Sequence, residues 1–252
     1  MLGAVAGDHS TIVMDAGNSV AHARTFLDSI SRYSVPPIRY LFFTHAHWDH
    51  VFGMQAFPDV VSLAHSETAK RIQELSQLEW DDQALDERVE RGQEVAYFRD
   101  MIKAELPNRA GLQINQPSAS FERRMQIDLG DTHCLLEWIG GDHASDASIA
   151  YIPSERIVFL GDCLYPQMDR EGRRYQFRNI SRLLERVLTY DAECYLLGHS
   201  PIVISRSRIE YWRNLLRTLE RKHGKSRENL ERSLEELISN MVETGGFSAA
   251  DN

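Results

Sequence analysis

A short apolar run followed by a dense set of metal-ligand side chains constrains this chain more than any other feature. Residues 39–44 (Arg-Tyr-Leu-Phe-Phe-Thr) are typical of a buried strand, and His45, His47, Asp49 and His50 follow directly. His45 and His47 stand two apart, so on extended backbone both imidazoles point the same way and one ion can take both. Asp49 and His50 are then placed to bind at a neighbouring metal position. Further ligands must therefore reach this strand end from elsewhere in the chain.

Three later segments repeat this arrangement of a strand followed by a ligand. In each, a β-like apolar run ends, often with glycine, and an imidazole or carboxylate side chain stands just beyond it. These side chains are His143, Asp162 and His199. Functional residues commonly lie in such loops beyond strand ends. If four strand ends converge on one edge of a sandwich, all seven groups come together, and the sequence therefore predicts a catalytic metal site.

The order of these motifs resembles that of the metallo-β-lactamase superfamily, over roughly residues 11–205. The resemblance is carried by Asp15 in Ile-Val-Met-Asp-Ala-Gly, by the His-x-His-x-Asp-His loop, by His143, and by Asp162 and His199, each after a glycine. It implies an α/β fold of the family's type, a four-layered αββα sandwich.

The resemblance also implies two metal sites that share one ligand. The sets carried over from the family are His45, His47 and His143 for one ion, and Asp49, His50 and His199 for the other. Asp162 would bridge the two ions, and Asp15 would support the site without binding metal. Imidazole and carboxylate donors without a thiolate favour two zinc ions per chain, with iron or manganese as alternatives.

A hydroxide shared by two such ions is a nucleophile ready to attack an electrophilic carbon. We expect Asp49 to orient this hydroxide and to shuttle its proton. Tyr165 stands three residues after Asp162, where lactonase-like relatives carry a tyrosine near the substrate carbonyl or leaving group; the alternative is a structural hydrogen bond. Asp146 either orients a ligand histidine or caps the next turn.

These features indicate an enzyme, a metallo-hydrolase that opens a cyclic or activated acyl bond of a lactone, a β-lactam or a thioester. Secreted zinc β-lactamases of the best-known group carry a cysteine at the position of Asp162, so the ligand set is closer to that of lactonases and thioesterases. Three other classes stay open: a phosphodiesterase of the same fold, a mononuclear-iron persulfide dioxygenase and an inactive binding protein. The acidic net charge and the missing nuclease cap argue against a phosphodiesterase. Retention of His50 and His199 argues against a mononuclear-iron dioxygenase, and the intact ligand set argues against an inactive binding protein.

Composition narrows the range of partners. The chain has 252 residues and a formal net charge of −9, which argues against nucleic acid. Because we find neither a signal peptide nor a transmembrane span, we expect no membrane partner and a cytoplasmic location. The predicted hydrolysis of an acyl bond implies a small-molecule substrate. Barely ten residues precede the Asp15 motif, so an incomplete N-terminus is a further expectation.

Cys134, Cys163 and Cys194 lack C-x-x-C spacing and are expected to be reduced, buried thiols, with Cys163 pointing into the core.

We expect a single domain over residues 1–252, with a helical insert at about 66–110 and C-terminal helices at about 205–243. Ser66 is predicted to cap the first helix of the insert, and a second helix is predicted from about 82 to 106. The insert either forms a wall over the site, with aromatic residues lining it, or only packs against the sandwich. The candidate aromatic residues are Trp80, Tyr97 and Phe98. Other helices are predicted at 19–33, 179–189, 208–222 and 227–242, and the last two offer a surface for a homodimer.

Overall fold

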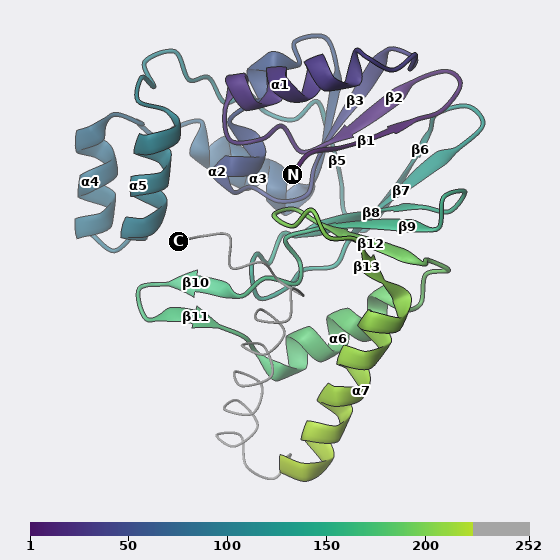
Figure 1. Ribbon diagram of the computed structural model, residues 1–252. Coiled ribbons are helices and arrows are strands. Elements are labelled where there is room, and N and C mark those ends of the chain that lie inside the picture. The colour runs from purple at the N-terminus through teal and green to yellow at the C-terminus, as the bar shows by residue number, and fades with distance from the viewer. Residues whose placement is uncertain (224–252) are drawn as a thin grey trace.

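The computed structural model describes residues 1–223, and its centre is a pair of β-sheets that face each other (Figure 1). The first sheet has the order β1-β2-β3-β4-β5. Its strands are β1 (Gly3–Ala6), β2 (Thr11–Met14), β3 (Ile38–Phe43), β4 (Val61–His65) and β5 (Ala119–Phe121). β1 runs antiparallel to β2, and the strands from β2 to β5 are parallel.

The second sheet has the order β13-β12-β9-β8-β7-β6. Its strands are β6 (Arg124–Asp128), β7 (His133–Trp138), β8 (Ser148–Ile152), β9 (Ile157–Gly161), β12 (Cys194–Leu197) and β13 (Ile204–Ser205). β9 and β12 are parallel, and the other neighbours are antiparallel. The parallel pairs β2-β3 and β9-β12 matter for the predicted site, because residues predicted to bind metal or to support the site follow β2, β3, β9 and β12.

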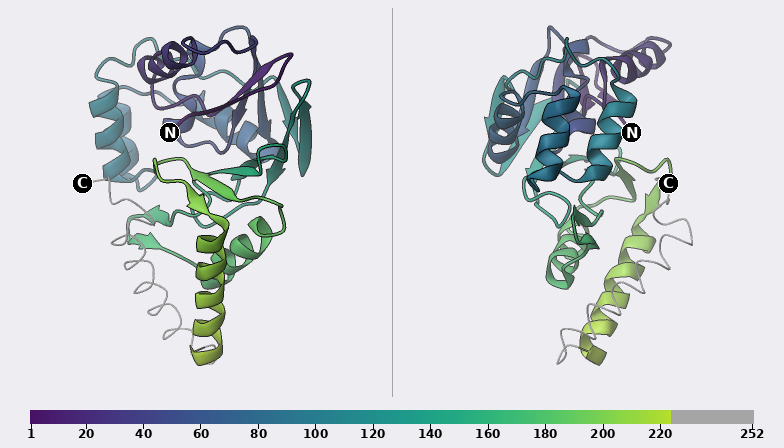
Figure 2. Two further views of the ribbon diagram at one scale, coloured as in Figure 1. Left: turned by 45° about the vertical axis from the view of Figure 1, so that its right-hand side comes forward. Right: turned by 90° about the vertical axis from the view of Figure 1, so that its left-hand side faces the viewer.

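Helices cover the outer face of each sheet and complete four layers (Figures 1 and 2). The first sheet is covered by α1 (Val20–Ile30), α2 (Trp48–Val51) and α3 (Ser66–Leu75), and the second by α6 (Phe177–Val187) and α7 (Arg206–His223). Alternate residues of a strand serve different layers: in β2, Val13 packs toward the helices, whereas Ile12 and Met14 pack toward the other sheet. The predicted αββα sandwich is thus confirmed.

The helical insert differs from its prediction in two details. The single helix expected over 82–106 is two helices, α4 (Asp82–Glu90) and α5 (Ala96–Glu105). The break lies at Gly92, whose φ of +75° ends α4 in the left-handed conformation that glycine adopts without strain. The N-cap of α3 is His65, whose Nδ1 accepts a bond from the amide of Glu67, and not Ser66, which is the first helical residue.

A short hairpin, β10 (Gln167–Asp169) and β11 (Gly172–Arg174), was not predicted. Its strands are polar and three residues long, so the sequence lacks the alternation that marks a strand. Cys163 is 2% exposed and packs in the core beside α6, as expected. The helix predicted over 227–242 lies outside the described residues. Within residues 1–223, no helix is long and apolar enough to cross a membrane.

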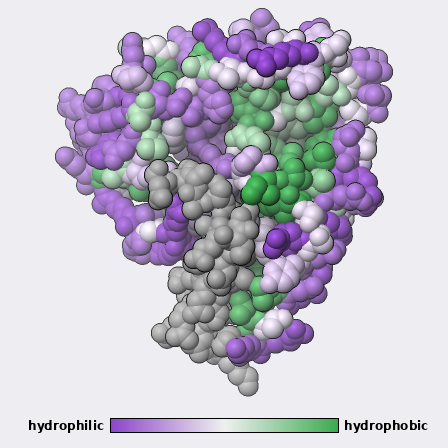
Figure 3. Space-filling view, viewed as in Figure 1, coloured by the Kyte–Doolittle hydropathy of each residue, from purple (hydrophilic) through white to green (hydrophobic). Residues whose placement is uncertain are grey.

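The face seen in Figure 3 is mostly polar over α4 and α5, with an apolar area near β12 and β13. Ile202 and Val203, which lead into β13, are 43% and 55% exposed.

Candidate metal centre

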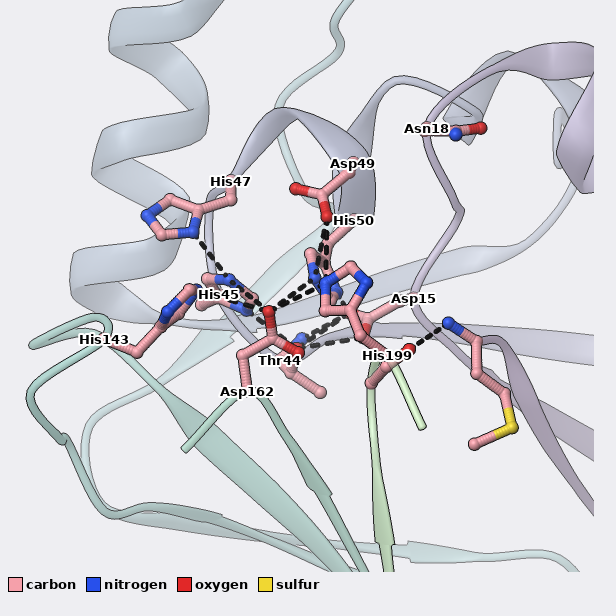
Figure 4. Close-up of polar contacts among 12 residues, drawn as sticks. Asp15, Asn18, Thr44, His45, His47, Asp49, His50, His143, Asp162 and His199 are labelled. Carbon is pink, nitrogen blue, oxygen red and sulfur yellow. Dashed lines mark hydrogen bonds and ion pairs between the residues drawn. The ribbon is translucent and has the colours of Figure 1, made fainter. Parts of the chain in front are cut away.

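The loops after four strands bring all seven predicted ligands to one place (Figure 4). They form two groups, and within each group one ligand atom per residue lies within 4.8 Å of the others. The first group is His45, His47 and His143, and the second is Asp49, His50, Asp162 and His199. The division matches the one carried over from the family resemblance, except that Asp162, expected between the ions, is grouped geometrically with the second set.

The loop after β3 supplies four of the seven groups because its backbone changes conformation partway. His47 is still extended, with φ of −75° and ψ of 150°, and α2 begins at the next residue. His45 and His47 therefore follow the spacing of an extended chain, and their rings meet with Nε2 and Nδ1 3.0 Å apart. The helical turn then directs Asp49 and His50 to the second group. Sequence analysis anticipated the extended part but not the helix.

Glycines before two of the other ligands permit close packing at the centre. Gly161 precedes Asp162 with φ of +53°, and a Cβ there would lie 2.9 Å from the Thr44 side chain. Gly198 precedes His199, and a Cβ there would collide with Oδ1 of Asp162. These two residues have no room for a side chain, which is why the ligands can sit so close together.

Asp15 supports the second group from beneath it. The residue is fully buried at the end of β2 with φ of +60°. Its carboxylate accepts bonds from the amide and hydroxyl of Thr44, at 2.8 and 2.9 Å, and lies 2.8 Å from Nδ1 of His50. A bond at Nδ1 fixes the ring and leaves Nε2 of His50 directed at Asp162, 3.2 Å away.

Asp146 supports the first group by a different route from either one expected. It is 1% exposed and accepts a bond from the amide of Ala46, between His45 and His47, at 3.1 Å. Arg71 lies 3.6 Å from the same carboxylate. Asp146 therefore holds the backbone of the ligand loop rather than a ligand imidazole.

The residues of the site fit bound cations. Oδ1 of Asp162 and Nε2 of His143 are buried without a hydrogen-bond partner, although the latter lies 3.2 Å from the other carboxylate oxygen. A buried carboxylate oxygen without a partner is costly. Five imidazoles and two carboxylates in contact are the donor set that zinc and related divalent metals prefer. Geometry and chemistry therefore fit a dinuclear metal site, as predicted, without identifying the metal.

The two groups differ in charge. Burial lowers the pKa of His45, and it lowers that of His47 to about 3, so these two histidines of the first group offer neutral imidazoles. In the second group burial also opposes charge on the histidines, but Asp162, Asp15 and Asp49 raise the pKa of His50 well above its usual value. Two of these carboxylates, Asp162 and Asp49, raise the pKa of His199 to about 9. A metal entering the second group must therefore displace protons.

Aromatic side chains surround the ligands. The ring of Tyr165 lies between two of them, 6.1 Å from that of His143 and 5.7 Å from that of His199. Phe98 of α5 lies 6.3 Å from His47 and contacts Tyr97. Three aromatic residues of the insert were candidates to line the site. For Trp80 this prediction is wrong, because its side chain is 8% exposed and packs on Phe52 in the core.

Comparison with known proteins agrees with this architecture. Among solved structures, a metallo-beta-lactamase from Pontibacter korlensis is 18% identical, with a TM-score of 0.56 and coverage of 85% of each chain. The DIM-1 metallo-beta-lactamase is 16% identical, with a TM-score of 0.57 and the same coverage. The sec-alkylsulfatase Pisa1 from Pseudomonas sp. is 15% identical, with a TM-score of 0.60, and the match covers 89% of this chain and 40% of that one. At these identities the likeness shows the fold alone.

Sequence comparison extends this result to the family. A search of curated protein sequences found no match. The family model of the metallo-beta-lactamase superfamily matches residues 3–199, a span that contains all seven predicted ligands. The chain therefore belongs to the metallo-beta-lactamase superfamily of hydrolases, as its motifs predicted.

Proposed function

We propose that this protein is a dizinc hydrolase that opens a cyclic or activated acyl bond in a small molecule: a lactone, a β-lactam or a thioester. The observation that carries the proposal is the pair of ligand groups, each with its atoms within 4.8 Å. His45, His47 and His143 would hold one ion, and the second group the other. When bound, the two ions supply an acidified water as nucleophile and positive charge for the acyl carbonyl.

Asp49 is suited to move the proton of that water. Its carboxylate lies 3.1 Å from Nε2 of His199 and 3.5 Å from that of His50. Burial opposes the charge of Asp49, but the charge on His50 and the bond to His199 hold its pKa well below the usual range. Asp49 is thus ionised at neutral pH in the metal-free protein, and because its side chain is 21% exposed it can exchange a proton with a leaving group.

Tyr165 is the second catalytic residue of the proposal. Its ring stands between one ligand of each group, His143 and His199, where a substrate carbonyl or leaving group would lie. A phenol O–H donated to an oxygen that gains negative charge stabilises the transition state more than the ground state.

The test begins with metal content. Protein purified without added metal is analysed by elemental mass spectrometry, and we expect about two zinc ions per chain. A single iron per chain would overturn the proposal in favour of oxygen chemistry.

The activity test uses a panel of lactones, β-lactams, thioesters and a bis-aryl phosphate. We expect Asp162→Asn to abolish turnover of the acyl substrates, while Asp191→Asn, an exposed residue in the turn before β12, serves as the matched control. Faster cleavage of the bis-aryl phosphate than of every acyl substrate would replace the hydrolase proposed here with a phosphodiesterase.

A further inference from the structure

Aromatic side chains border one half of the ligand cluster. Phe98, on the first turn of α5, lies 6.3 Å from the ring of His47, with the two rings tilted by 39°. Tyr97 packs against Phe98 at 5.6 Å. We call these two residues the α5 wall. His47 belongs to the all-histidine group, so the apolar surface stands beside the ion that this group would hold.

The α5 wall is anchored on several sides. At the far end of α5, the carboxylate of Glu105 accepts a bond of 2.7 Å from the hydroxyl of Ser19, which is also the N-cap of α1. Lys103 bonds both carboxylate oxygens of Asp86 on α4 at 2.9 Å. Ile102 is 1% exposed and packs in the core. α5 is therefore held to α1, α4 and the core, and it presents Phe98 in a fixed position.

The hairpin β10-β11 adds a further connection. The guanidinium of Arg170 donates to the carbonyl of Val89 near the end of α4, and it packs over Gly92, where a Cβ would lie 2.8 Å from it. The hairpin that follows Tyr165 is thereby joined to the insert that carries Phe98. This contact holds the hairpin against the end of α4.

The other half of the cluster has a polar border. In Figure 4, Asn18 lies beyond Asp49 and His199, on the opposite side from His47 and His143. The Oδ1 atom of Asn18 lies 2.9 Å from Nδ1 of His22, which fixes this imidazole at the start of α1. Burial and the charge of the N-terminal ammonium lower the pKa of His22, while Glu105 and Asp49 act in the opposite direction. A neutral imidazole and an amide thus stand on the side of the second group.

The border at Phe98 is apolar, whereas the border at Asn18 and His22 is polar. A substrate that lies between them therefore needs one apolar end and one polar end. On the proposed function, the carbonyl is held at the all-histidine group and the leaving group at the second group. We propose that the site selects substrates with an apolar acyl chain that packs on Phe98 and a polar leaving group beside Asn18 and His22. Phe98 is the residue that sets acyl-chain preference.

The test is a chain-length series. Thioesters of one polar thiol with acetyl, butyryl, hexanoyl and octanoyl groups are compared by kcat/KM. Full burial of one methylene corresponds to about a fourfold gain in kcat/KM, and against a partly exposed ring we expect about a twofold gain per methylene. Over the four methylenes from butyryl to octanoyl this amounts to roughly 16-fold. Phe98→Ala should reduce that ratio to about twofold.

Two variants serve as controls. Phe98→Leu keeps an apolar side chain and should keep most of the chain-length preference. Tyr33→Ala removes an aromatic ring that is 72% exposed after α1, and it should behave as wild type. A chain-length ratio that is unchanged in Phe98→Ala would overturn the role of Phe98.

A binding measurement separates this inference from the proposed function. Titration calorimetry with butyrate and octanoate reports on the α5 wall without turnover, and we expect octanoate to bind about 16-fold more tightly than butyrate in wild type but not in Phe98→Ala. If no thioester, lactone or β-lactam is hydrolysed, the proposed function fails, and the calorimetric ratio still decides on the wall. If acyl substrates are hydrolysed but neither kcat/KM nor the binding affinity rises with chain length in wild type, only the present inference fails.

Discussion

Replacement of Asp15 by asparagine should weaken binding of the second metal ion and leave the first in place. The carboxylate lies between the amide of Thr44 and Nδ1 of His50, each at 2.8 Å. It serves as an acceptor toward both. Asparagine has one acceptor oxygen and one NH₂ group, so it satisfies only one of these neighbours. Asparagine also tolerates the φ of +60° at this position, so the backbone need not change.

The direction of the effect follows from the proton on His50. If the asparagine oxygen keeps the amide of Thr44, its NH₂ faces Nδ1, which must then accept. The remaining ring proton moves to Nε2, the nitrogen that points toward Asp162, and a protonated nitrogen cannot bind metal. Loss of such an outer partner costs 10- to 100-fold in metal affinity. That loss corresponds to about 1.4–2.8 kcal/mol.

The assay is competition with a chromogenic zinc chelator, analysed for two dissociation constants and checked by elemental mass spectrometry. Asp146→Asn is the matched control, because this residue is as deeply buried but bonds the amide of Ala46 in the loop of the first group. We expect Asp15→Asn to weaken binding of the second ion. Asp146→Asn, whose remaining oxygen can still accept the bond from Ala46, should leave the affinity for the second ion unchanged. Second-ion affinity in Asp15→Asn within twofold of wild type would refute the reasoning.

Three further predictions concern ligands, catalysis and pH. His143→Ala and Asp162→Ala should each lose metal and activity together by elemental and kinetic analysis; full metal content and rate in either variant would contradict the assignment. Tyr165→Phe should keep its metal and lower kcat/KM for acyl substrates roughly tenfold or more, whereas an unchanged rate would indicate a structural phenol. The metal-free protein should lose stability as pH rises from about 6.5 to about 9 in urea titrations. In the folded protein the pKa of His199 is raised to about 9. The protonated His199 therefore stabilises the fold fully below pH 6.5, and this stabilisation is lost as the pH rises to about 9. The pKa of His50 is also raised, so His50 acts in the same direction. Because His199 is 39% exposed, we expect a loss on the order of 1 kcal/mol, and constant stability over this range would contradict the charge pattern.

Much of the fold was predictable because its signals are local. The strand before the His-x-His-x-Asp-His loop is an uninterrupted apolar run, and the alternation in β2 divides its side chains between two layers. The helix over 82–106 was wrong at one point, since an isolated glycine is compatible with a continuous helix until its φ is known. The hairpin β10-β11 was missed because its polar, three-residue strands carry no pattern.

The sequence by itself determined which residue types stand at the ends of the strands, and with the family resemblance it predicted all seven ligands and the support from Asp15. Only the tertiary structure decided what surrounds them. Asp146 bonds the amide of Ala46 from 100 positions away, and Phe98 borders His47 because α5 is tied to α1 and α4. Such contacts depend on how distant segments pack, and packing is set by the sum of many weak interactions rather than by the spacing of residues along the chain.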